Sequence, residues 1–135
     1  MEKIYSKVED GELLHILFKK EEINKARTDI SPENQYLQLS ALNLNKGKTF
    51  RPHKHIIHEK ITDRAQESWV VIQGKVKAIL FDLDDNVIRE AILEPGDISI
   101  TFNGGHNYEI LEDNTLVYEY KTGPYLGQEF DKVFI

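Results

Sequence analysis

The chain has 135 residues, 40% of them hydrophobic, which is the usual size of one domain with its own core. It contains no cysteine, which excludes thiolate nucleophiles, thiolate metal ligands and disulfides, so any metal would be held by His, Asp or Glu. The net charge of −6, with Lys and Arg scattered along the chain, argues against nucleic acid as a partner.

No apolar run approaches the ~18 residues that a transmembrane helix needs. The N-terminal sequence MEKIYSKVEDGELLHILFKK is too charged for a secretory signal. We therefore expect a soluble, cytoplasmic protein without a membrane partner. Because no repeat or linker is visible, a single domain over residues 1–135 is expected.

The first third of the chain has a mixed pattern. Leu13 to Phe18 reads as a short apolar strand, and Lys20 to Arg27 as a helical turn or two that ends before the breaker at 29–32. From Gln35 onward, apolar and polar residues alternate with the period of a strand.

The remainder of the chain is predicted to be β-rich. Turn-forming residues punctuate it at 84–86, 94–97 and 103–105. Strands at such short spacing indicate an antiparallel sandwich or barrel. Residues 56–66 are charged and aperiodic, and we expect them to form a loop beside the mouth of the barrel. The expected strands are Ser68–Gln73, Lys75–Phe81, Val87–Leu93, Ile98–Phe102, Asn107–Leu111 and Thr115–Tyr120.

Four residues are candidate metal ligands. If the stretch around His53 and His55 is extended, both imidazoles project from one face, with Lys54 on the other. Glu67 begins an otherwise apolar strand, where a buried carboxylate needs a partner such as a divalent cation. His106 follows a glycine-rich turn. The alternatives are solvated histidines and a solvated glutamate at a strand end.

Together these positions resemble the two motifs of the cupin superfamily. Gly47, His53, His55, Glu67 and Gly74 fill the places of the first motif, and Gly96 with His106 resembles the second. The resemblance implies an all-β jelly-roll barrel, also called a double-stranded β-helix, with His53, His55, Glu67 and His106 as ligands of one metal ion. Two features depart from the family pattern. Eleven residues separate His55 from Glu67 where cupins have only a few, and Thr101-Phe102-Asn103 replaces the usual Pro-x-Gly.

The stretches Arg51–His55 and Val117–Tyr125 look like those of the WbuC-type cupins, which are typically encoded among bacterial surface-polysaccharide genes. The similarity covers a core of about 35–125. It implies a metalloprotein whose ligand is a small oxygen-rich molecule, such as a sugar or nucleotide-sugar intermediate of polysaccharide synthesis. It also implies a homodimer, and the strand expected at 13–18 could add to the sheet of a second copy.

Three histidines and one carboxylate suit Fe, Mn, Ni, Co or Zn as the divalent ion, so the ligands alone do not choose the metal. Candidate pocket residues are Arg51, Trp69, Tyr108, Tyr118 and Glu119. If the protein is an enzyme, a metal-dependent isomerase or epimerase and a dioxygenase both remain open. Two other possibilities are a non-catalytic module that senses a metal or sugar, and a metal-free sugar epimerase or ketoisomerase that uses the histidines as acid and base.

Overall fold

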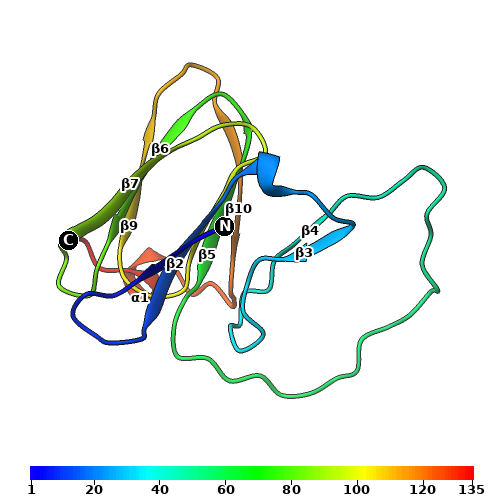
Figure 1. Ribbon diagram of the computed structural model, residues 1–135. Helices are drawn as coiled ribbons and strands as arrows, with labels where there is room; N and C mark the ends of the chain where they lie inside the picture. Colours follow the sequence, from blue (N-terminus) through cyan, green and yellow to red (C-terminus); the bar gives the residue numbers. More distant parts are fainter.

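The computed structural model describes residues 1–135, and the prediction of an all-β protein is confirmed (Figure 1). Helical structure is confined to a single 3-10 turn, η1 (Lys20–Glu22), and the short helix α1 (Gln128–Asp131). The strands are β1 (Glu2–Tyr5), β2 (Leu13–Phe18), β3 (Arg27–Asp29), β4 (Ser40–Leu42), β5 (Glu67–Gln73), β6 (Val76–Phe81), β7 (Val87–Leu93), β8 (Ile98–Thr101), β9 (His106–Ile110) and β10 (Leu116–Lys121).

The strands form three antiparallel sheets. The largest has the order β1-β2-β8-β5-β10, a second has the order β7-β6-β9, and β3 pairs with β4. The two larger sheets pack face to face through inward side chains such as Val71 of β5 and Leu80 of β6. They form a sandwich and do not close into the predicted barrel, because no strand bridges them.

Strands β2 and β8 are buried on both faces. One face of the five-stranded sheet packs against β6 and β7, while Ile16 and Ile100 on the other face pack under the β3–β4 hairpin with Ile30 and Ala41. A strand that is covered on both faces has no face in contact with solvent. The sequence of β2 is therefore nearly continuously apolar rather than alternating between apolar and polar residues.

An ion pair joins the two sheets along one side of the sandwich. The guanidinium of Arg89 on β7 donates to both carboxylate oxygens of Glu2 on β1, at 2.8 and 3.2 Å. This bidentate pair links the two sheets at that side. On the opposite side, β9 and β10 are each the last strand of their sheet, with no partner along the outer edge.

Residues 45–63, here called the arm, contain no helix or strand. Figure 1 shows the arm running out from the body of the protein between β4 and β5. Its ends are fixed, because Asn43 N–H donates to the carbonyl of Ala26 and Arg64 pairs with Glu12. The predicted loop at 56–66 thus lacks secondary structure as expected. Its first part projects away from the sheets rather than lying beside a barrel mouth, while Gln66 at its end is buried and bonded to Thr122.

Most predicted strands match within a residue or two, and the N-terminal helical prediction needs correction. Helix is limited to Lys20–Glu22, and Arg27 instead begins β3, where it pairs with Leu42 of β4. The alternation after Gln35 yields only the short strand β4. Tertiary pairing overrides local pattern in both places. No helix in the structure is long and apolar enough to span a membrane.

The strand considered for dimer formation, β2, lies inside its sheet. It pairs with β1 on one side and β8 on the other, so it offers no free edge to a second copy. The free edges of the five-stranded sheet belong to β1 and β10.

Candidate functional site

A cavity of about 750 Å³ lies at one end of the sandwich. Both sheets contribute to its wall, together with the turn at 103–105 and the C-terminal residues 131–135. Among the residues that line it are Glu67 and Trp69 of β5, His106 and Tyr108 of β9, and Glu119 of β10. A cavity of this size accommodates a small organic molecule.

Glu67 and His106 meet in this cavity from opposite sheets. The Nε2 atom of His106 lies 3.1 Å from Oε1 of Glu67, and both side chains are largely buried, with 26% and 12% of their surfaces exposed. With Glu67 ionised, His106 donates this hydrogen bond from Nε2. Its other ring nitrogen, Nδ1, is buried and has no partner in the protein. The site therefore contains a polar atom that the protein itself leaves unsatisfied.

The Glu67 carboxylate is stabilised by its neighbours. Burial opposes ionisation, but the hydrogen bond and charge of His106, the N–H of Trp69 and the charge of Lys121 outweigh it, and the pKa of Glu67 lies below its usual value. Glu67 is therefore an anion at neutral pH, ready to accept hydrogen bonds or to bind a cation.

Trp69 and Tyr108 form a stacked aromatic pair beside Glu67. Their ring centroids are 3.9 Å apart and the rings are nearly parallel. The indole N–H of Trp69 is shared between Oε1 of Glu67, at 3.1 Å, and Oε2 of Glu119, at 3.3 Å. Tyr108 donates its hydroxyl to Ser99, and burial raises the pKa of Tyr108. These contacts hold Glu67 in place and make one wall of the cavity apolar.

The C-terminal segment forms another wall of the cavity. Lys121, at the end of β10, lies 3.2 Å from Asp131 of α1, and its ammonium group is 4.3 Å from the ring centre of Tyr125. These contacts anchor residues 131–135 across the end of the sandwich, where Ile135 lies against Gly105. The sequence offered little signal for this wall, because residues 132–135 form no helix or strand.

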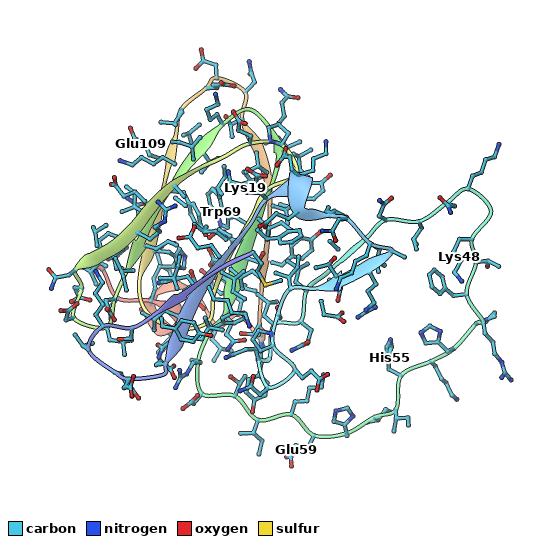
Figure 2. All side chains as sticks on the ribbon, in the orientation of Figure 1. Lys19, Lys48, His55, Glu59, Trp69 and Glu109 are labelled. Atoms are coloured by element: carbon cyan, nitrogen blue, oxygen red, sulfur yellow. The ribbon has the colours of Figure 1, made fainter.

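Two of the four predicted ligands lie outside this site. His53 and His55 are on the exposed arm with their rings 5.5 Å apart, and the only hydrogen bond of His53 is to the carbonyl of Arg51. Figure 2 shows His55 on the arm, far from Trp69 in the body of the protein. The shared face of the two imidazoles required an extended strand, but residues 51–55 form no strand and have no neighbouring one, so nothing holds the imidazoles against the sheets.

The predicted pocket residues divide in the same way. Trp69, Tyr108 and Glu119 line the cavity, whereas Arg51 is exposed on the arm. Tyr118 lies on the outer face of β10, 52% exposed, because side chains alternate along a strand and Glu119 takes the inner face.

The side chains in the cavity provide some, but not all, of the ligands that a metal ion needs. Glu67 and His106 offer a carboxylate and an imidazole, a combination that suits the first-row divalent ions, and the unpartnered Nδ1 shows that His106 lacks one partner. No three His, Asp or Glu side chains, however, lie close enough together to hold an ion. The complete four-residue site is therefore not assembled in this structure.

His15, for which the sequence predicted no role, lies behind two residues that line the cavity, Phe81 and Thr101. His15 is fully buried in β2, where Nε2 donates to the carbonyl of Phe81 at 2.9 Å and Nδ1 accepts from the hydroxyl of Thr101 at 3.0 Å. In the sequence it stands out as the only polar residue of an apolar strand. Burial, more than the nearby charge of His106, lowers the pKa of His15 to about 4, against the raising effects of Phe81 and Asp82.

Stability should therefore fall in mild acid because of His15. Between pH 6.5, the ordinary pKa of histidine, and about 4, the unfolded chain binds a proton at this residue and the folded chain does not. The loss should reach about 3 kcal/mol, at about 1.4 kcal/mol per pKa unit. Urea unfolding from about pH 7 to about pH 4.5 measures it, with His15→Gln as the comparison. The wild type and the variant share the acidic groups, so an equal pH slope in both would contradict this role for His15.

No family model, no curated protein and no solved structure matches this chain. The function of the candidate site is therefore inferred from its geometry alone.

Proposed function

We propose that this chain is a metal-binding cupin in which Glu67 and His106 hold one divalent transition metal, Fe, Mn, Ni, Co or Zn, with His53 and His55 of the arm as further ligands. The observation that carries the proposal is the meeting of Glu67 and His106 inside a cavity, with a buried nitrogen of His106 left without a partner. A bound ion would supply Lewis acidity or, for iron, redox chemistry.

The proposed ligand is a small oxygen-rich molecule. The cavity volume suits a sugar-sized compound. The aromatic pair of Trp69 and Tyr108 offers an apolar wall, and Glu119 offers a hydrogen-bond acceptor beside it. The resemblance to WbuC-type cupins suggests a sugar or nucleotide-sugar intermediate of surface-polysaccharide synthesis.

Metal analysis tests this proposal directly. Protein purified without a polyhistidine tag should contain close to one transition-metal ion per chain, or should take up one when Zn(II) or Co(II) is added. Trp69 is the only tryptophan and donates its indole N–H to Glu67, so its fluorescence should change during the titration. Absence of bound metal, together with a flat titration, would refute the proposal.

A second candidate is a metal-free epimerase or ketoisomerase. The observation in its favour is that Glu67 and His106 already form a carboxylate–imidazole pair at 3.1 Å, an arrangement that can move a proton. Turnover of a sugar substrate by metal-depleted protein would support it. If the metal-loaded protein binds sugars but turns over none of a broad panel, the non-catalytic binding module is favoured.

A further inference from the structure

We propose that the cavity selects a ligand that carries a protonated amine, such as an amino sugar, over a phosphorylated one, and that Glu119 receives the amine. This specificity rests on the proposed function only in so far as the cavity takes a small oxygen-rich molecule. Three features of the cavity support it: the charge of its wall, the free hydrogen-bonding capacity of Glu119 and the aromatic surface beside Glu119.

Negative charge dominates the wall of the cavity. The charged side chains that line it, other than His106, are Glu67, Asp82, Asp85, Glu119, Asp131 and a single lysine, Lys132. No arginine lines it, although arginine is the side chain that binds phosphate through two parallel hydrogen bonds. A cavity lined mainly by one sign of charge attracts ligands of the opposite sign and repels those of the same sign. The wall therefore favours a cationic ligand over a phosphorylated one.

Three of the five carboxylates already have partners in the protein. Asp82 is buried and accepts three hydrogen bonds, two of them from backbone N–H groups. Asp131 pairs with Lys121 at 3.2 Å. Glu67 pairs with His106 at 3.1 Å. These groups contribute negative charge to the cavity, but their oxygens have less capacity left for a ligand.

Glu119 is the carboxylate best placed to accept from a ligand. Its Oε2 atom accepts one hydrogen bond, from the indole N–H of Trp69 at 3.3 Å, and its Oε1 atom accepts none. The nearest cation, the ammonium group of Lys121, is 3.9 Å from Oε1 and closer to Asp131. An ionised carboxylate has about four acceptor positions, so most of those on Glu119 are free. Asp85 accepts no hydrogen bond either, but it lies in the exposed turn before β7.

The aromatic pair lies next to Glu119. Trp69 stacks on Tyr108 and donates to Glu119, so the free carboxylate and the apolar wall are adjacent. Aromatic rings provide contact area for a ring-shaped ligand, and their π systems attract cations. A metal ion on Glu67 and His106 would offset the charge of Glu67 and leave Glu119 free. The same preference is therefore expected with metal bound.

Three ligands that share one sugar ring and differ in charge test this inference: glucosamine, glucose and glucose 1-phosphate. Calorimetry and Trp69 fluorescence measure their affinities at pH about 6.5, where an amine is protonated. Glucosamine should bind about fivefold more tightly than glucose, the size expected for an ion pair with a carboxylate that is 44% exposed. Glucose 1-phosphate should bind about tenfold more weakly than glucose.

Variants assign the preference to a residue. Glu119→Gln keeps an acceptor for Trp69 and should bring the affinity for glucosamine to within about twofold of that for glucose. Asp85→Asn removes the same charge from the cavity wall and should retain most of the preference. Its backbone is at positive φ, which asparagine tolerates. If these two variants lose the preference equally, the general charge of the cavity explains it and the role of Glu119 is overturned.

The other outcomes separate this inference from the proposed function. If glucose 1-phosphate binds as tightly as glucosamine, the amine preference is overturned, and the assignment of a small oxygen-rich ligand stands. If none of the three binds, both are overturned. If no Zn(II) binds but the order of affinities is as expected, the metal site fails and the amine preference stands.

Discussion

Replacing Asp97 with alanine is expected to lower the free energy of unfolding by about 3 kcal/mol, the cost of leaving charged and backbone donors without their acceptor. Asp97 is buried and accepts from Lys19 Nζ at 2.7 Å, from Lys20 N–H at 3.0 Å and from Glu94 N–H at 2.9 Å. The carboxylate thus fixes the turn before β8 to the chain that follows β2.

Urea unfolding at neutral pH measures this loss, with Asp113→Ala as the control. Asp113 is exposed and makes no hydrogen bond through its side chain, so its replacement should change stability by less than about 0.5 kcal/mol. Asp97→Asn should cost less than Asp97→Ala, since the amide oxygen can still accept. Equal stabilities of Asp97→Ala and Asp113→Ala would refute the role assigned to Asp97.

Glu67→Gln is expected to weaken the proposed metal binding by about 100-fold or more. The change removes the only carboxylate that contacts His106, while the amide keeps nearly the same shape and can still accept from Trp69. Loss of a charged partner in a largely buried pair costs about 3 kcal/mol or more, and each 1.4 kcal/mol is a factor of ten in affinity.

Isothermal titration with Zn(II) measures this affinity, and Glu109→Gln is the matched control. Glu109 also belongs to this acidic protein and lies on β9 near His106, but its side chain is exposed outside the cavity (Figure 2). The control should bind Zn(II) like the wild type. If both variants lose affinity equally, long-range charge rather than coordination by Glu67 explains the effect.

Much of the fold could be predicted because its strands carry local signals. β7 was predicted at its observed bounds, and so was β2, from apolar content and flanking turns. The turn at 94–97 also forms as expected, with Asp97 N–H bonded to the carbonyl of Glu94 and Gly96 at positive φ. β1 and β3 went unpredicted because short strands at sheet edges depend on partners remote in sequence.

The candidate site was predictable only in part, for the same reason. Glu67 and His106 lie on regular strands, so the packing of the two sheets is enough to bring them together across 39 residues of chain. His53 and His55 have the right alternation, but a strand exists only where a neighbouring edge pairs with it. The C-terminal wall of the cavity depends on the contact of Lys121 with Asp131. Nothing in the sequence around either residue predicts this contact.

The Glu2–Arg89 pair has a kinetic consequence for any ligand. It joins β1 to β7 at one side of the sandwich, and the contact of Glu67 with His106 joins β5 to β9 toward the other, so the two sheets are held together at both sides. The C-terminal residues 131–135, which wall the cavity, are held to the sheet through Asp131 and Lys121. The rate at which this segment detaches would then set the residence time of whatever the cavity holds.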